Sequence, residues 1–272
     1  MMTKELIMPS ITRLLLSVAA ALSVSSASLA QESRTSAQID HLSPAAIAAR
    51  SAEPGLLLAA TRGDPQAKFL LGHSAYHGLT KEVDYIEALD WFLQAAQSNH
   101  PDAMSYLGRI YWGGNGVLAD HEEAIEWYER AAEVGSVDAY AFLGEVNLNG
   151  EGGLYIDKQQ ARYWLTKAVK AFHPQSAVYL GFMFLDGDAG LPKSEEEAFA
   201  LFEFAANEGH PYGAYLTGSM LYNGVGRERD LESSRRYFSQ SCEAGYQRAC
   251  GVPQLNNESS ALQNIGRSFS LD

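Results

Sequence analysis

The sequence predicts an all-α fold, an α-solenoid of about five helical hairpins of 36–37 residues each. Three series of residues recur with one shared period, which is the signature of a repeat protein. The first series holds the glycine of a Leu-Gly or Thr-Gly pair at Gly72, Gly108, Gly144, Gly181 and Gly218. The second holds a pair of small or apolar residues at 59–60, 95–96, 131–132, 168–169, 205–206 and 241–242. The third holds Asp84, Asp120, Asp157, Ser194 and Asp230. Hairpins that cannot bury their apolar faces alone must stack, so the repeats predict one continuous core.

The first helix of each hairpin is clearest in residues 101–112. Ala103, Leu107 and Ile110 recur there at helical spacing, and Pro101 suits the first turn of a helix. A glycine inside a helix costs about 1 kcal/mol relative to alanine. Because Gly108 has a counterpart in every hairpin, we expect a neighbouring helix to come too close there for a side chain.

The second helix of each hairpin begins at the third series. Asp120 and Glu123 have the form of a capping box, with Asp120 as N-cap and Glu123 reaching back to it. Ala124 and Tyr128 continue the buried stripe, and Gly135 ends the helix.

The domain boundaries follow from the repeats. The solenoid is expected over residues 45–252, with a half-repeat around 56–63 as its N-terminal cap and a cap at its C-terminal end. Its repeats are about 64–100, 101–136, 137–173, 174–210 and 211–250. Residues 31–44 and 253–272 lack the period, and we expect them to be flexible.

Residues 1–30 have the form of a cleavable signal peptide. Lys4 and Arg13 precede an apolar run at 14–24, and small residues lead to Ala30, where cleavage is expected. A membrane anchor is the alternative, but the run is shorter than the ~20 residues that a spanning helix needs. Export from a Gram-negative cell would place the protein in the periplasm, with full secretion as the other possibility.

The charge of the chain disfavours nucleic acid as a partner. The formal net charge is -13 for the 272 residues, so the surface repels polyanions. Removal of residues 1–30 takes away two basic residues and one acidic residue, which leaves 18 minus 32, or -14.

Residues 103–135 resemble the Sel1-like repeat, a relative of the tetratricopeptide repeat. They follow its pattern Ala-x-x-x-Leu-Gly-x-x-Tyr, then Gly-x-Gly-Val-x-x-Asp, then Ala-x-x-Trp-x-x-x-Ala-Ala-x-x-Gly. The pattern recurs over residues 56–250, with Asn147 and Thr217 among the departures from it. The resemblance implies a right-handed superhelix whose concave face is lined by the first helices. It also implies a scaffold or adaptor that binds other proteins.

Tetratricopeptide geometry then implies which side chains line that groove. They lie two residues before, two after and five after the leucine of each Leu-Gly pair, with Tyr212 nearby. The predicted groove residues are Phe69, His73, Tyr76, Ser105, Arg109, Trp112, Glu145, Leu148, Phe182, Leu185, Tyr212, Tyr215 and Tyr222. The set is rich in aromatic residues, which are common in protein interfaces. A superhelix tight enough to bury these residues on one another is the alternative.

The sequence offers little for catalysis or metal binding. His73 and His77 stand at i and i+4 and supply two ligands, but no third can be named. His100, His173 and His210 share one slot of successive repeats, roughly 10 Å apart, and cannot hold one ion. The chain shows no nucleophile motif, phosphate loop or dinucleotide fingerprint. We therefore predict a non-enzymatic protein with no cofactor and no metal.

The two cysteines, Cys242 and Cys250, are eight residues apart. In one helix they would lie ~12 Å apart along the axis, too far for a disulfide. Gly245 ends the helix between them, however, so the two slots face each other across a tight turn. Cysteine-rich exported relatives carry a pair at this spacing, and this resemblance implies a disulfide that closes the C-terminal end. A metal site and free thiols are the alternatives.

The predicted function is that of an exported scaffold that binds a protein partner in its groove, and that regulates an envelope sensor or an assembly. One alternative is an immunity protein that neutralises a toxic secreted effector such as a lipase. Another is a cell-wall-active enzyme. The sequence predicts neither the identity of the partner nor the oligomeric state, and it predicts no stable membrane insertion.

Overall fold

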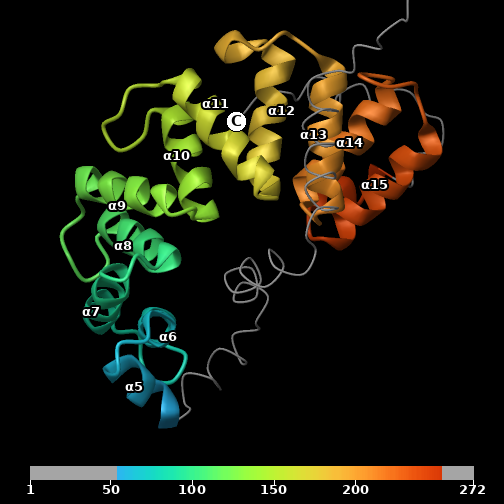
Figure 1. Ribbon diagram of the computed structural model, residues 1–272. Coiled ribbons are helices and arrows are strands. Elements are labelled where there is room, and N and C mark those ends of the chain that lie inside the picture. The colour runs from blue at the N-terminus through green and yellow to red at the C-terminus, as the bar shows by residue number, and fades with distance from the viewer. Residues whose placement is uncertain (1–53, 253–272) are drawn as a thin grey trace, which may run out of the picture. The chain divides into compact units, whose positions relative to one another are not determined.

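The computed structural model describes residues 54–252, and every regular element in this range is helical (Figure 1). The eleven α-helices of the described range are α5 (Pro54–Thr61), α6 (Pro65–His77), α7 (Tyr85–Ala96), α8 (Pro101–Gly113), α9 (His121–Glu133), α10 (Val137–Asn149), α11 (Lys158–Lys170), α12 (Pro174–Asp186), α13 (Glu195–Asn207), α14 (Pro211–Asn223) and α15 (Leu231–Glu243). Two short 3-10 helices are η1 (Asp188–Gly190) and η2 (Gln247–Ala249). The predicted α-solenoid of five hairpins is confirmed. Its right-handedness and concave face stay predictions.

Several predicted segments lie outside the described residues. These are the signal peptide at 1–30, the flexible segment at 31–44, the first residues of the solenoid at 45–53 and the tail at 253–272.

The described residues form two compact units. Unit 1 contains the chain up to Leu143 and also the separate segment Glu151–Leu154. Unit 2 contains Gly144–Gly150 and the chain from Tyr155 on. Within unit 1, α5 packs on α6 as the predicted half-repeat, and α6–α7 and α8–α9 form hairpins 1 and 2. Within unit 2, α12–α13 and α14–α15 form hairpins 4 and 5. Hairpin 3, α10–α11, contains the boundary.

The repeated glycines lie where the two helices of a hairpin touch. A Cβ on Gly108 would lie 2.6 Å from the ring of Tyr128 on α9, and one on Gly181 would lie 2.5 Å from the ring of Phe202 on α13. Gly72, Gly144 and Gly218 meet the second helices of their own hairpins in the same way. The expected close approach is confirmed, because the glycine makes room for a large buried side chain.

The second helices carry the predicted N-caps. The Asp120 carboxylate accepts the backbone N–H of Glu123, and Asp84, Asp157, Ser194 and Asp230 cap their helices in the same way. The predicted return contact, from the Glu123 carboxylate to the backbone N–H of Asp120, is wrong. Its backbone N–H donates to the carbonyl of Tyr111 at 2.9 Å, so the Glu123 carboxylate has no donor to reach. All five hairpins make this bond from the N-cap back to the first helix.

The turn between one hairpin and the next is also a single repeated device. A residue in the left-handed region is followed by an N-cap whose N–H donates to a carbonyl five residues earlier. Glycine fills the left-handed position at 63, 135, 209 and 245, as its missing Cβ allows. Asn99 and Phe172 fill it in the other two turns, with φ of 57° and 65°.

Candidate protein-binding surface

The predicted groove residues fall into two groups in the structure. Ten of them are half-buried or exposed, namely His73, Tyr76, Arg109, Trp112, Glu145, Leu148, Leu185, Tyr212, Tyr215 and Tyr222. The other three, Phe69, Ser105 and Phe182, are 2%, 2% and 4% exposed, so the solvent-facing placement predicted for them is wrong.

Packing between helices explains the three buried residues. The ring of Phe69 stacks on that of His100, with centroids 4.7 Å apart, and Ser105 bonds to the Ser136 hydroxyl at 2.8 Å. The ring of Phe182 packs edge-on against Phe202, 5.3 Å away. Each of these side chains therefore joins its helix to a neighbour.

In hairpins 2 and 4 the first of the three predicted groove positions is displaced by one residue. The half-buried residue is the one directly before the leucine, Tyr106 or Tyr179, whereas Ser105 and Val178 behind it are buried. Tyr106 is thus a surface residue that the sequence analysis missed. The recurrence of tyrosine at this position in both hairpins was the available signal.

Unit 1 gathers these side chains into one group, which we call the Tyr–Arg cluster: Tyr76, His77, Tyr106 and Arg109. The guanidinium carbon of Arg109 lies 4.9 Å from the centroid of the Tyr106 ring. Tyr106 Oη is 3.1 Å from His77 Nε2, and the Tyr76 and Tyr106 rings meet edge to face at 5.2 Å. Residues of α6 and α8 therefore form a single patch.

Two residues at the margin hold the cluster in place. The Asn115 amide donates to Tyr76 Oη at 3.3 Å, and the Asp138 carboxylate lies 3.7 Å from a terminal nitrogen of Arg109. Arg109 keeps 46% of its side chain exposed, so it is available to a ligand.

The electrostatics of the cluster leave Arg109 as its cation at neutral pH. Burial, with the nearby charges of His77 and Arg109, lowers the pKa of His73 to about 4. Burial and Arg109 likewise lower the pKa of His77. Burial raises the pKa of the Tyr76 hydroxyl, so it stays protonated. The Tyr–Arg cluster thus presents two aromatic rings, the neutral imidazole of His77 and one guanidinium.

Trp112 lies at the far end of α8 and also packs against its neighbours. Its ring is 4.3 Å from that of His121 and meets Phe142 edge-on at 4.9 Å. Gly152 comes so close that a Cβ there would collide with the indole. Trp112 is therefore partly a packing residue.

Unit 2 has its own tyrosine group at the end of the repeats. The rings of Tyr212 and Tyr215 lie 5.4 and 5.0 Å from that of Tyr246, which the sequence analysis did not select. Tyr246 lies within the stretch that the cysteines close. Further back in unit 2, Glu145 accepts the Tyr179 hydroxyl at 2.9 Å.

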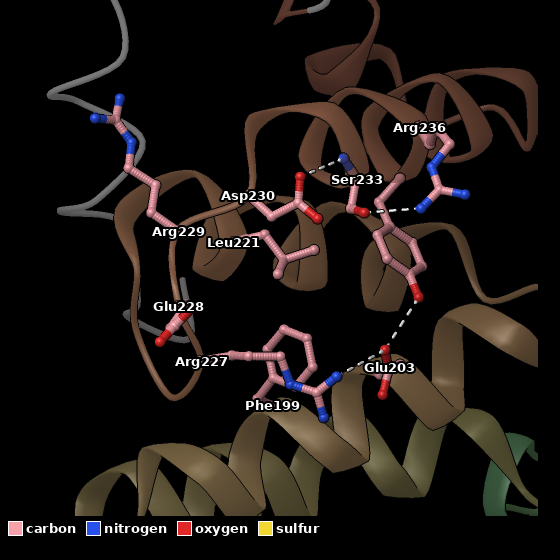
Figure 2. A pocket seen from close by; sticks show the side chains of 10 residues that line it. Phe199, Glu203, Leu221, Arg227, Glu228, Arg229, Asp230, Ser233 and Arg236 are labelled. Carbon is pink, nitrogen blue, oxygen red and sulfur yellow. Dashed lines mark hydrogen bonds and ion pairs between the residues drawn. The ribbon is translucent and has the colours of Figure 1, made fainter.

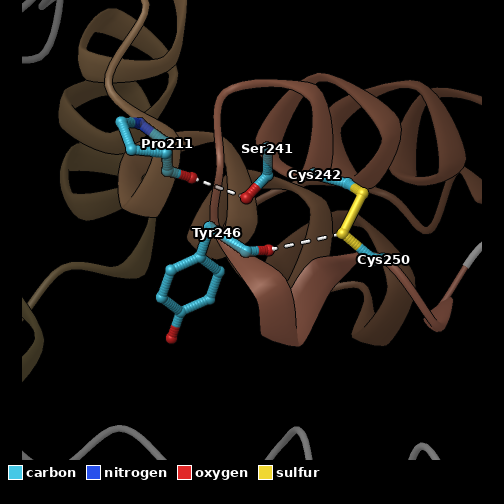
Figure 3. Close-up of a disulfide and its surroundings, with 5 residues drawn as sticks. All are labelled: Pro211, Ser241, Cys242, Tyr246 and Cys250. Carbon is cyan, nitrogen blue, oxygen red and sulfur yellow. Dashed lines mark hydrogen bonds between the residues drawn. A yellow bond between two sulfur atoms is a disulfide. The ribbon is translucent and has the colours of Figure 1, made fainter.

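The predicted disulfide between Cys242 and Cys250 is present (Figure 3). The two Cα atoms lie 4.8 Å apart. The helix that would have begun a sixth repeat is replaced by η2, and the bridge ties this turn to the end of α15. The Ser241 hydroxyl donates to the Pro211 carbonyl at 2.7 Å and joins α15 to α14.

The three junction histidines are N-caps of first helices. His100 Nδ1 accepts the backbone N–H of Ala103 at 3.3 Å, and its Nε2 lies 3.0 Å from Gln66 Oε1. His210 repeats the arrangement, and His173 caps α12 through Ser176. Because Nδ1 accepts, the proton resides on Nε2. Burial lowers the pKa of His100 to about 4, so the ring is neutral at pH 7.

The structure offers no assembled site for a metal over residues 54–252. No three side chains of His, Cys, Asp or Glu in that range gather around a possible ion. His73 and His77 lie close, with ring centroids 4.4 Å apart. In the same range no helix has the length and apolar character to cross a membrane.

Stacked helical hairpins with a part-exposed aromatic face define a class, the helical-repeat proteins that bind other proteins. Matches to the Sel1 repeat model cover residues 65–100, 101–136, 137–171, 174–210 and 211–246. The chain belongs to the Sel1 repeat family. Members of this family are protein-interaction scaffolds and are generally non-catalytic.

Solved structures agree with this assignment. A protective antigen of uropathogenic Escherichia coli strains is 31% identical, with a TM-score of 0.65, over 71% of this chain and 41% of its own. A Sel1 repeat protein from Oxalobacter formigenes is 28% identical, with a TM-score of 0.69, over 74% of this chain and 58% of its own. This chain thus spans less than two thirds of either protein.

Two further comparisons add no functional assignment. An immunity protein from Pseudomonas aeruginosa is 18% identical, with a TM-score of 0.46, over 72% of this chain and 75% of its own, and a likeness this weak carries no argument. Curated proteins give no match.

Proposed function

We propose that this protein is a non-enzymatic scaffold that binds a protein partner on the first-helix face of hairpins 1 and 2. The observation that carries the proposal is the Tyr–Arg cluster of Tyr76, His77, Tyr106 and Arg109. Its rings and guanidinium are mutually packed and still part-exposed.

The composition of the cluster supports a protein ligand. Tyrosine and arginine are enriched among the residues that dominate binding energy in interfaces. Contacts among Tyr76, Tyr106 and Arg109 restrict their rotamers before any ligand arrives, which reduces the entropy lost on binding. Arg109, as the one cation of the cluster, favours a partner surface that offers a carboxylate or a carbonyl group.

We also propose that the protein is exported, and that its partner is an envelope sensor or assembly component. The form of residues 1–30 supports export, as does a disulfide, because such bonds persist in oxidising compartments. Cell fractionation followed by N-terminal sequencing tests this. A mature chain that begins at Gln31 supports export, whereas a cytoplasmic chain that keeps residues 1–30 refutes it.

The immunity and enzyme alternatives draw no support from a specific contact in the described residues. The scaffold role is therefore the one that the Tyr–Arg cluster favours.

The test is a double variant, Tyr76→Ala with Arg109→Ala, used as bait in an envelope extract. We expect it to lose most of a partner that the unchanged protein retains, while its melting temperature falls by only a few degrees.

The matched control is Tyr163→Ala with Lys167→Ala, a part-exposed aromatic–cation pair on the second helix α11. This control should retain the partner. Equal loss in both variants, or no loss in the first, would refute the proposed surface.

A further inference from the structure

Unit 2 contains a cavity of about 580 Å³ between α13, α15 and the loop that joins α14 to α15 (Figure 2). Its walls are formed by Phe199, Glu203, Leu221, Arg227, Glu228, Arg229, Asp230, Ser233, Arg236 and Tyr237. The loop is pressed onto the start of α13, since a Cβ on Gly226 would collide with the Glu195 carbonyl oxygen. One wall of the cavity is therefore fixed in place.

The loop of this cavity differs from its counterparts in hairpins 2 and 3, and it carries one more charged residue than the Lys-Glu-Val of hairpin 1. Residues 227–229 read Arg-Glu-Arg directly before the N-cap Asp230. The same three positions are Val-Leu-Ala at 117–119 in hairpin 2 and Leu-Tyr-Ile at 154–156 in hairpin 3. Since apolar residues satisfy the fold at these positions, the charges of hairpin 5 are not required by it.

The floor of the cavity is apolar and one side is basic. Phe199 and Leu221 are 1% and 4% exposed, yet both line the cavity. The guanidinium carbon of Arg227 lies 4.5 Å from the centroid of the Phe199 ring, and its side chain is 58% exposed. Figure 2 shows Arg227 across the cavity from Asp230 and Ser233.

Two of the three acidic groups in the walls are already engaged. The Asp230 carboxylate accepts the backbone N–H groups of Glu232 and Ser233 as the N-cap of α15. Glu203 accepts the Tyr237 hydroxyl at 3.3 Å and lies 3.8 Å from a terminal nitrogen of Arg227.

The arginines retain donors. Arg236 donates to the Ser233 hydroxyl at 2.7 Å and forms no ion pair with any residue in the range 54–252. Besides its contact with the Phe199 ring, Arg227 has the long ion pair with Glu203. Arg229 donates through Nε to the Tyr222 carbonyl, and Figure 2 shows its guanidinium turned away from the other labelled residues. Arg227 and Arg236 therefore keep guanidinium N–H groups that can bind a ligand.

We propose that this cavity binds a peptide carboxylate. Guanidinium groups hold carboxylates through paired, charge-assisted hydrogen bonds, and the buried Phe199 ring packs against the guanidinium of Arg227. The carboxylate can be an Asp or Glu side chain or the C-terminus of a chain. The site is separate from the Tyr–Arg cluster and does not rest on it.

Titration of the full chain with three peptides, followed by NMR or calorimetry, tests the proposal. The probes are acetyl-Ala-Glu-Phe-amide, which carries a side-chain carboxylate, acetyl-Ala-Ala-Phe with a free terminus, and the neutral acetyl-Ala-Gln-Phe-amide. At least one of the two acidic peptides should bind about tenfold tighter than the neutral one, and the pair shows which carboxylate is recognised. Equal binding of all three, or none up to about 5 mM, would overturn the proposal.

Substitutions locate the site. Arg227→Gln and Arg236→Gln should each weaken acidic-peptide binding about tenfold and leave the neutral peptide unaffected. Glu228→Gln, a change in the same loop that removes a negative charge, should leave binding unchanged or strengthen it. Tyr76→Ala should have no effect, which separates this site from the Tyr–Arg cluster. Undiminished binding in both arginine variants, with melting temperatures preserved, would place the peptide elsewhere and refute the proposal.

Discussion

Hairpins 1 and 2 and hairpins 4 and 5 share one frame but present different faces. In all four, a first-helix glycine admits a large side chain, and the same N-cap bonds join the two helices. Two residues after the leucine position, however, hairpins 1 and 2 carry part-exposed His73 and exposed Arg109, whereas hairpins 4 and 5 bury Phe182 and Ser219. The repeat therefore specifies the frame, and the side chains between its fixed positions decide whether a helix offers a surface or adds to the core.

The largest effect should come from truncating the buried side chain at the position two residues after the leucine. Phe182→Ala should lower the free energy of unfolding by about 3–5 kcal/mol, because it opens a cavity against Phe202. Arg109→Ala, at the same position of hairpin 2, should cost less than about 1 kcal/mol, since its ion pair with Asp138 is exposed. Urea unfolding measures both, and equal costs would contradict the comparison.

Acid should act next, through the N-cap of α8. The pKa of His100 is about 4 in the folded protein, below the ordinary value of 6.5. The neutral His100 ring therefore makes its full contribution to the stability of the fold above pH 6.5, and this contribution is lost as the pH falls from 6.5 to about 4. It amounts to at most about 3 kcal/mol.

Thermal unfolding across this pH range checks the role of His100. His100→Asn keeps a side chain suited to the N-cap but removes the titrating group, so its melting temperature should depend less on pH. Ser136 is the natural counterpart, since it caps α10 without titrating. An identical pH profile in the variant would exclude His100 as a source of acid sensitivity.

Loss of the disulfide should cost about 2–3 kcal/mol, the value expected for the entropy of a short loop. Contacts in a solenoid are local, so the loss should be confined to the end of hairpin 5, where Tyr246 meets Tyr212 and Tyr215. Hydrogen exchange of Cys242→Ser/Cys250→Ser should show faster amides in η2 and α14 and unchanged amides in α6 and α8. Uniformly faster exchange would be inconsistent with a local staple.

The smallest effect should be a gain in stability. Phe172 has φ of 65° at a turn position that is glycine in four of the six equivalent turns. Phe172→Gly removes this strain. It also removes the contact with Phe204 and raises the conformational entropy of the unfolded chain, so we expect a net gain in stability of about 1 kcal/mol or less. Gly135→Phe, the reverse change in unit 1, should destabilise. A loss in the first variant would mean that the contact with Phe204 outweighs the strain.

The features that could be predicted from the sequence are those that recur. The period, the glycine contacts and the Asp120 N-cap all follow from residues that keep their position in each repeat, whereas the cysteine pairing followed from the resemblance to cysteine-rich relatives. The exposed side of a first helix is set by the rotation of that helix against its neighbours. An error of one residue turns a side chain by about 100°, which is why Ser105 was predicted in place of Tyr106.

The features that could not be predicted depend on contacts between repeats. Tyr246 joins Tyr212 only because the chain turns into η2, and the basic cavity forms only because the loop at Arg227 rests on α13. Neither contact leaves a periodic trace in the sequence. The burial of Phe69 is of the same kind, since it depends on the cap His100 of the next hairpin.

Site-specific photo-crosslinking in the native host tests most directly whether partners bind the first-helix face. A benzophenone residue at Tyr106 on α8 would be compared with one at Glu126, an exposed position on the second helix α9. We predict a discrete adduct from position 106 that disappears with Arg109→Ala, and no such adduct from position 126. The same adduct from position 126, with none from position 106, would contradict the account.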